Sequence, residues 1–329
     1  MKKLSVFIIV LAILASCTQN ETVSVPKTNF ISFSDAFVDK ATRADLSINK
    51  KDDLKEFSVW GHHSNVVILK NITVTKQLDE TWDYSISPAK PQWEEGEEYY
   101  FHAFAPRGAM NITYPDFTSK TGIPSNIYYQ LDVDKRKQDL IYANHNRVQG
   151  LTILGEIVDY SKVDFTFHHL LSRVMFTFTN KLTSGESIEI LDVQITNVQK
   201  DAIVHLDDLD HTKWTWDGHN AEAIYNFGGT GVIPAVAGAN VKPAEDVLFV
   251  IPAPARDYEV LFTIKYGSET STKKATVSGL QFEMGYSYNF KAEINDDDVT
   301  KPNNEINFDV VDVQGWDTKV GSDVVLDFN

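Results

Sequence analysis

The chain contains one cysteine, Cys17, and its position suits one covalent reaction, the attachment of lipid to a thiol. Two lysines precede an apolar run from Leu4 to Leu14, and Ala15 and Ser16 supply small residues directly before the cysteine. This pattern is typical of an exported precursor that a signal peptidase cleaves, and the run is too short to span a bilayer as a stable helix. We therefore predict a signal peptide over residues 1–16 and a lipid on Cys17. An ordinary cleaved signal with an uninvolved thiol is the alternative.

Other reactive residues form no catalytic pattern. The pairs His62-His63 and His168-His169 are neighbours on expected strands, so their side chains point to opposite faces and neither pair can chelate one metal. Asp296–Asp298 lacks the ligand spacing of a calcium loop and indicates a solvated linker. The sequence has neither a nucleophile elbow nor a glycine-rich phosphate loop. We expect no enzyme activity, no metal and no cofactor.

Tryptophans offer a second kind of chemistry, stacking on sugar rings. Trp214 and Trp216 share one face at strand spacing. With Trp60, Trp82 and Trp93 they could form a carbohydrate platform, although aromatic side chains more often pack in a core. Both interpretations stay open from the sequence.

A candidate processing site lies at Arg43 and Ala44, within the polar stretch Lys40–Asp45. Proteases cut exposed, flexible segments, so an Arg-specific protease could cleave after Arg43. An arginine in a loop without such a role is the alternative.

Composition narrows the class of protein. The chain has 329 residues, a formal net charge of −16 and 43% hydrophobic residues, which allows one or two domains with a sizeable core. An acidic chain repels phosphate backbones, so we exclude nucleic acid as a partner. With its only cysteine assigned to lipid, the chain has no disulfide, and its stability must come from packing and strand pairing.

Alternation of apolar and polar residues predicts an all-β chain. In Tyr286–Ile294 every second residue is apolar, and Val174–Phe178 shows the same pattern. The alternating run Tyr258–Tyr266 leads through Gly267 and Ser268 towards Lys274–Val277, which predicts a hairpin. No stretch carries a convincing helical stripe.

The ends of the chain hold further strand-like segments. Order is expected to begin near Phe30, Ile31 and Phe33, and a second sheet system near Val163. Residues 295–304 are acidic and contain a proline, which favours a linker. Beyond it lie two apolar segments that have nothing downstream to pair with and so need a partner strand. Their apolar residues are Ile306, Phe308 and Val310 in the first, and Val324, Leu326 and Phe328 in the second.

Together these features resemble the fimbrillins, the subunits of type V pili of Bacteroidales, over essentially the whole length. Besides the segment ending at Cys17, the order and spacing of several motifs carry the resemblance. These are Thr42-Arg43-Ala44, Phe57–Gly61, Tyr99–Pro106, Gln138–Ala143, Phe165–Val174 and Gly285–Phe290.

The resemblance implies two tandem transthyretin-like (Greek-key) β-sandwich domains with a C-terminal strand extension. The implied divisions are a signal peptide (1–16), a propeptide with the first strand (17–43), an N-terminal domain (44–162), a C-terminal domain (163–294), and a linker with a donor segment (295–329).

It also implies a mode of assembly. An outer-membrane lipoprotein precursor is cut by an Arg-specific surface protease, which removes the strand carrying Phe30, Ile31 and Phe33. The C-terminal segment of another fimbrial subunit then fills the groove in an extracellular fimbrium. We expect a stalk or accessory subunit, with a host or bacterial surface ligand as a further partner. A tip or adhesin subunit, and a glycan-binding lipoprotein that keeps its lipid, are the alternatives.

Overall fold

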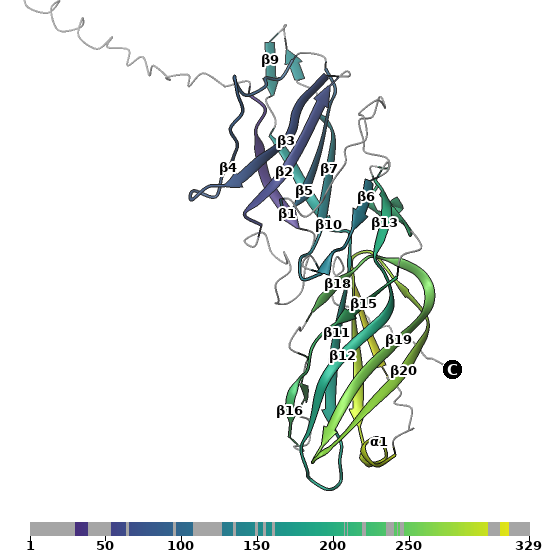
Figure 1. Ribbon diagram of the computed structural model, residues 1–329. Helices are drawn as coiled ribbons and strands as arrows, with labels where there is room; N and C mark the ends of the chain where they lie inside the picture. The colour runs from purple at the N-terminus through teal and green to yellow at the C-terminus, as the bar shows by residue number, and fades with distance from the viewer. Residues whose placement is uncertain are drawn as a thin grey trace, which may run out of the picture.

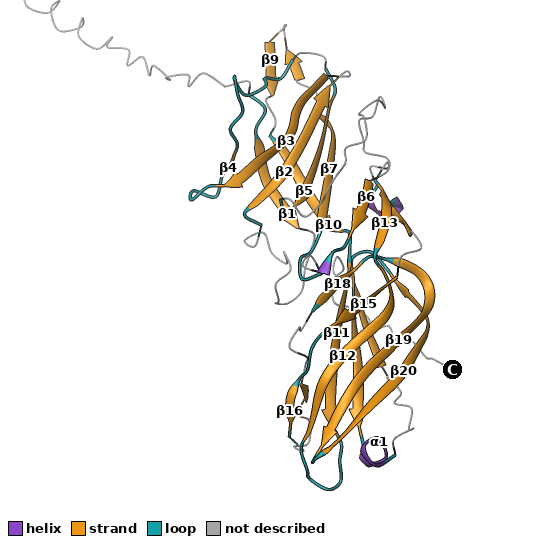
Figure 2. Ribbon diagram, viewed as in Figure 1, coloured by secondary structure: helices purple, strands orange, loops and turns teal. Residues whose placement is uncertain are grey.

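The computed structural model describes residues 30–38, 54–63, 66–94, 97–107, 127–133, 136–148, 151–153, 156–159, 162–206, 208, 210–218, 222–234, 240–241, 243, 247–301 and 310–315. Almost every element among them is a strand (Figure 2). The strands form two bodies arranged end to end, with the N-terminal body at the top of Figure 1. The predicted all-β, sandwich-like fold is confirmed.

The first body is a sheet that closes on itself in the order β1-β10-β7-β5-β2-β3-β4. All neighbouring pairs are antiparallel except β1 and β10, which run parallel. Alternation sets the faces: in β10, Val163, Phe165 and Phe167 are buried while Asp164 and Thr166 are exposed. The strands are β1 (Phe33–Val38), β2 (Glu56–His63), β3 (Val66–Lys76), β4 (Trp82–Asp83), β5 (Tyr99–Ala105), β7 (Ile141–Val148) and β10 (Val163–His169).

The second body has two sheets with a shared apolar core. Across that core, the rings of Phe178 and Phe262 are 5.4 Å apart. The first sheet has the order β17-β11-β21-β22, with β18 also on β11; the second has the order β15-β12-β19-β20, with β16 also on β12. The strands are β11 (Ser172–Asn180), β12 (Ile188–Gln199), β15 (Glu222–Asn226), β16 (Gly231–Ile233), β17 (Asn240–Val241), β18 (Leu248–Val250), β19 (Ala253–Tyr266), β20 (Glu269–Phe282), β21 (Tyr286–Ile294) and β22 (Val310–Gly315).

Smaller elements lie around these bodies. A sheet of order β14-β13-β6 stands near their junction, and β8 and β9 form a hairpin. At the junction, Tyr142 of the first body packs against Trp214, with ring centroids 4.9 Å apart. The remaining elements are β6 (Ile127–Gln130), β8 (Leu151–Ile153), β9 (Glu156–Asp159), β13 (Asp201–His205), β14 (Thr215–Gly218), the 3-10 turn η2 (His211–Lys213) and the short helix α1 (Asp296–Thr300).

The predicted hairpin is confirmed. Tyr266 of β19 faces Glu269 of β20 across the two-residue turn Gly267-Ser268. The strand predicted at Tyr286–Ile294 is also present, as β21. Both succeed because strict alternation matches a sheet with one buried face.

The chain passes from the first body to the second a few residues beyond Val163, close to the expected boundary. Strand β10 begins at Val163 but pairs with β1 and β7 of the first body. The second body begins with β11 at Ser172. Alternation predicts a strand here but cannot tell which sheet the strand joins. The strand pairing places the crossing between the two bodies at Leu170 and Leu171.

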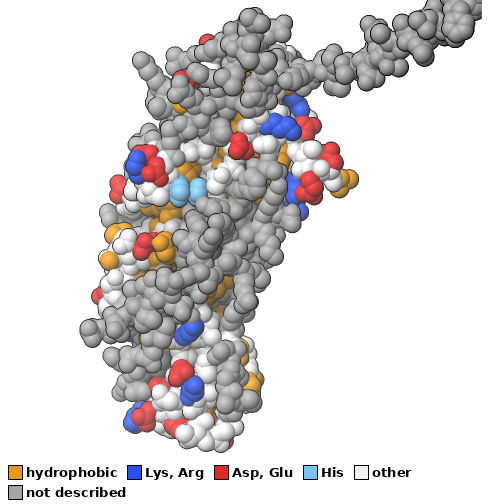
Figure 3. Space-filling model, turned by 180° about the vertical axis from the view of Figure 1, so that it is seen from behind, with side chains coloured by type: hydrophobic (Ala, Val, Ile, Leu, Met, Phe, Trp, Pro, Cys, Tyr) orange, Lys and Arg blue, Asp and Glu red, His pale blue; other side chains and the backbone are white. Residues whose placement is uncertain are grey.

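The surface carries mixed charge. On the face shown in Figure 3, acidic and basic side chains of the described residues are interspersed. Within the described segments, no helix has both the length and the apolar character needed to cross a membrane.

Candidate strand-exchange site

The N-terminal strand fills the core of the first body. Phe33 is 2% exposed, and its ring contacts four other aromatic rings at centroid distances of 5.4 to 6.2 Å. Ile31 is fully buried. Aromatic clusters of this kind contribute both buried area and favourable ring geometry. The four ring partners of Phe33 are Phe57, Tyr84, Phe101 and Phe165.

Backbone hydrogen bonds fix the residues before β1. The Ile31 N–H donates to the Pro91 carbonyl at 2.9 Å, and the Val163 N–H donates to the Ser32 carbonyl at 2.8 Å. The Tyr84 hydroxyl donates to the Ile31 carbonyl at 2.8 Å. The buried backbone around Ile31 is thus satisfied from three separate segments of the first body.

Strand β1 also closes the sheet. It runs parallel to β10 from Phe33 opposite Val163 to Val38 opposite Phe167. On its other side, Phe33 faces Trp82 of β4 in antiparallel register. A sheet of this order without β1 has two open edges, on β10 and on β4, and an apolar floor between them.

Burial and a nearby carboxylate keep the Tyr84 hydroxyl neutral. Burial raises the pKa of the Tyr84 hydroxyl, and the nearby Asp83 carboxylate raises it further. Lys90 donates to Asp83, which lowers the pKa of that carboxyl, and the ammonium of Lys90 lies 4.8 Å from the centre of the Tyr84 ring. The hydroxyl therefore remains a donor to Ile31 at physiological pH.

Of the three residues predicted on the N-terminal strand, two lie in the core. Ile31 and Phe33 are buried, whereas Phe30 is half-buried, makes an isolated bridge to Gln92 and precedes the strand, which starts at Phe33. Sequence reasoning missed Ala36, which is fully buried. A register shift between Phe33 and Ala36 breaks the alternation, so a period of two puts Ala36 on the wrong face.

Three predicted residues lie outside the described part of the chain: the lipidation site Cys17 and the processing pair Arg43 and Ala44. Their roles stay predictions.

Part of the C-terminal segment has a partner in its own chain. Strand β22 pairs antiparallel with β21, from Tyr286 opposite Gly315 to Lys291 opposite Val310. For Val310–Gly315, the partner strand that the sequence requires therefore lies upstream in the same chain. The remaining predicted donor residues, Ile306, Phe308, Val324, Leu326 and Phe328, lie outside the described residues.

The segment expected to be a linker begins with an ordered helix. Asn295 caps α1 by accepting from the Asp297 N–H at 2.9 Å, and the Asp298 carboxylate accepts from the Asn295 N–H at 2.8 Å. Asp298 is 2% exposed, and the buried Lys273 ammonium donates to the Lys301 carbonyl at 2.7 Å. The aspartates at the start of the helix are stabilised by its N-terminus rather than by solvent alone.

The tryptophans do not form the broad platform considered above. Trp60, Trp82, Trp93 and Trp214 are between 3% and 6% exposed, so they pack in the interior. Trp216 is half-buried, and its indole N–H donates to the Leu170 carbonyl at 2.8 Å.

The histidine pairs belong to the packed interior as well. His62, His63, His168 and His169 are between 1% and 9% exposed, and His169 Nδ1 lies 2.6 Å from the buried Asp139 carboxylate. Among the described residues, no cluster of three or more His, Cys, Asp or Glu side chains is suited to hold a metal ion.

The fold and the site define an all-β protein of two bodies whose N-terminal strand completes the core of the first. The chain belongs to the fimbrillin-like family, whose sequence model matches residues 42–316. Membership makes it a fimbrial or adhesion-related surface protein. No curated protein matches it in sequence.

Solved structures support the fold. A candidate cell adhesion protein of Bacteroides uniformis is 16% identical, with a TM-score of 0.52 over 88% of this chain and 99% of that one. A candidate cell adhesion protein of Bacteroides ovatus is 14% identical, with a TM-score of 0.50 over 89% and 99% of the two chains. At these identities the likeness concerns the fold alone.

Proposed function

We propose that this chain is a structural, non-enzymatic subunit of a surface fimbria, in a stalk or accessory position. It is exported as a lipoprotein acylated at Cys17 and held at the outer membrane. An Arg-specific protease cuts between Arg43 and Ala44, and the subunits then polymerise by strand exchange. Family membership supports the fimbrial role, and the interior position of β1 supports the exchange.

The observation that carries the proposal is the burial of Ile31 and Phe33 in the core of the first body. Full burial of an apolar side chain is worth about 1.5 to 3 kcal/mol, so an empty groove is unfavourable once these two have left. Cleavage after Arg43 would separate them from the body covalently, because both precede the cut. A replacement strand would restore the buried area and the hydrogen bonds on β10 and β4.

The proposed replacement is the C-terminal segment of another copy or a related subunit. Ile306, Phe308 and Val310 alternate as a strand with one apolar face requires, and Val324, Leu326 and Phe328 repeat the pattern. Donation from one copy to the next gives a head-to-tail contact, which generates open filaments. Residues 310–315 pair with β21 of their own chain, so donation of Val310 requires this pairing to open.

The test is polymerisation of the purified chain after addition of an Arg-specific protease, followed as a ladder that resists detergent on an unheated gel. We expect the ladder from the unaltered chain and from the matched control Lys40→Ala. Arg43→Ala and deletion of residues 306–329 should each abolish it. A ladder from the deletion variant would rule out the donor segment, and a cleaved chain that stays monomeric would rule out the mechanism.

A further inference from the structure

A cavity of about 760 Å³ lies at the junction of the two bodies. The end of β10, the η2–β14 segment, the start of β19 and the turn between β20 and β21 all contribute to its lining. Its volume falls within the range of about 300–1,000 Å³ found for small-molecule sites, which often form where domains meet. It is separate from β1, the proposed exchange strand.

Hydrogen bonds hold the walls of this cavity in place. The Trp216 indole donates to the Leu170 carbonyl at 2.8 Å, and the Trp214 indole donates to the Asp208 carbonyl at 2.7 Å. At the turn between β20 and β21, the Ser172 hydroxyl donates to the Glu283 carbonyl at 2.6 Å, and the Glu283 N–H donates to the Tyr288 hydroxyl at 2.8 Å. A site built this way needs little ordering when a ligand binds.

The lining combines apolar surfaces with polar groups. Trp216, Met284 and Tyr286 pack against the core yet remain half-buried, so part of each is left exposed. Asp217 and Glu283 are exposed beside them and can accept hydrogen bonds from hydroxyl groups. A pyranose ring has matching chemistry, because one face presents C–H groups to aromatic rings while its edge presents hydroxyls.

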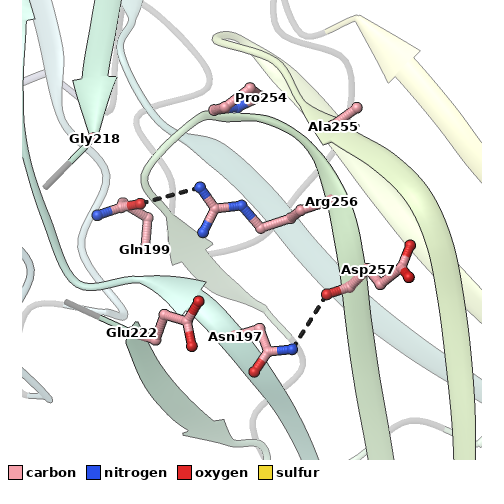
Figure 4. Close-up of a pocket in the computed structure, with 8 residues that line it drawn as sticks. All are labelled: Asn197, Gln199, Gly218, Glu222, Pro254, Ala255, Arg256 and Asp257. Carbon is pink, nitrogen blue, oxygen red and sulfur yellow. Dashed lines mark hydrogen bonds between the residues drawn. The ribbon is translucent and has the colours of Figure 1, made fainter. Parts of the chain in front are cut away.

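A smaller polar pocket of about 390 Å³ adjoins this cavity. Gly218, Pro254 and Arg256 line both. In Figure 4, Arg256 points from β19 towards Gln199 of β12, to which its guanidinium donates at 3.3 Å. Asn197, Glu222 and Asp257 complete the polar lining. The two pockets together suit a ligand of more than one unit, with polar groups along its length.

Charge selects against an anionic ligand. Among the described residues that line the larger cavity, Arg256 is the only lysine or arginine, and Asp217 and Glu283 oppose it. A carboxylate or phosphate would therefore meet more negative than positive charge here.

From this combination we propose that the junction cavity binds a neutral oligosaccharide, with Trp216 and Tyr286 against the sugar faces and Asp217 and Glu283 accepting from hydroxyls. The assignment goes beyond the proposed polymerisation and does not depend on it. A sugar site on a subunit would give the assembled filament many copies of a weak contact, which raises avidity.

The test measures binding to the full chain in detergent by titration calorimetry and saturation-transfer NMR. The ligands are four neutral trisaccharides (maltotriose, cellotriose, mannotriose and tri-N-acetylchitotriose), the anionic sugar sialyllactose, and a set of extended tripeptides. We expect at least one neutral trisaccharide to bind more tightly than sialyllactose and the peptides. Asp217→Asn and Tyr286→Ser should each weaken that binding by about tenfold, equivalent to about 1.4 kcal/mol.

The matched control is Asp164→Asn, an exposed aspartate on β10 outside the cavity lining, which should bind like the unaltered chain. Absence of binding to every neutral sugar, preference for peptides or sialyllactose, or unchanged binding in both cavity variants would overturn the proposal. Protease-triggered ladders from Asp217→Asn are expected to be normal, which separates this result from the test of strand exchange.

Discussion

The Tyr84 hydroxyl donates a buried hydrogen bond to the Ile31 carbonyl at 2.8 Å, joining the residue after β4 to the segment before β1. Burial raises the pKa of this hydroxyl, so it stays protonated and able to donate. It is a specific polar contact between the first body and the segment that we propose is removed.

Tyr84→Phe should therefore loosen that segment while keeping the ring in the core. We expect a loss of about 0.5–1.5 kcal/mol in the free energy of unfolding, the usual net value of one hydrogen bond. Release of the N-terminal fragment after cleavage should also be faster, as measured by size-exclusion chromatography. Tyr128→Phe is the matched control, because its hydroxyl bonds to Asp201 at an exposed site. Equal release rates in the two variants would exclude this role of Tyr84.

Phe33→Ala should be strongly destabilising. The side chain is 2% exposed and touches four aromatic rings, and truncation of a buried phenylalanine costs about 3–5 kcal/mol. The urea midpoint of the uncleaved chain measures this loss. Ser34→Ala, a half-buried neighbour on the same strand, should change the free energy of unfolding by less than about 0.5 kcal/mol. A similar midpoint for both variants would mean that β1 contributes little to the core.

Asn295→Ala tests the N-terminal cap of α1, the helix that follows β21. Asn295 caps α1 through the Asp297 N–H, and loss of such a cap costs about 1 kcal/mol. The control is Asp297→Ala, which keeps the cap, removes an exposed pair with Lys301 and one acidic charge of the first turn, and should cost less than loss of the cap. Urea unfolding of both variants gives the comparison, and equal losses would contradict the capping role.

Parts of this fold could be predicted from the sequence because the alternation of apolar and polar residues reflects which side chains of a strand are buried. The strand Tyr286–Ile294 and the hairpin at Gly267-Ser268 follow from residues close together in the chain. The helix α1 was missed because Lys273 of β20, whose ammonium donates to the Lys301 carbonyl at the end of the helix, belongs to a distant segment. Without the capping hydrogen bonds and this contact in view, three successive aspartates suggest a solvated run.

The pairing of strands that lie far apart in the sequence could not be predicted. The parallel pairing of β1 with β10 and the antiparallel pairing of β22 with β21 join residues that no local pattern connects. The register shift before Ala36 hid one core residue of β1. The junction cavity was invisible for the same reason, since Trp216 and Tyr286 lie on different strands and only the tertiary structure brings them to one site.

Alkaline pH should destabilise the second body through Tyr258. Burial raises the pKa of its hydroxyl to about 12, whereas an unfolded tyrosine titrates near 10. Between these values the unfolded chain loses the proton that the folded chain keeps, so the free energy of unfolding falls as pH rises through this window. Urea midpoints at about pH 9 and about pH 11.5 should show the fall.

Tyr258→Phe should reduce this alkaline loss. Within the described part of the chain, the Tyr258 hydroxyl is buried without a hydrogen-bond partner, so its removal should leave stability at neutral pH unchanged or raised. A variant with the same alkaline slope as the unaltered chain would contradict the assignment to Tyr258.

The central claim is that the chain is cut after Arg43 and then assembled. Mass spectrometry of the N-terminus of subunits in detergent-resistant filaments from the cell surface tests it most directly. The account predicts a chain that begins at Ala44, without lipid and without Ile31 and Phe33. Subunits that begin at an acylated Cys17 and retain β1 within those filaments would contradict it.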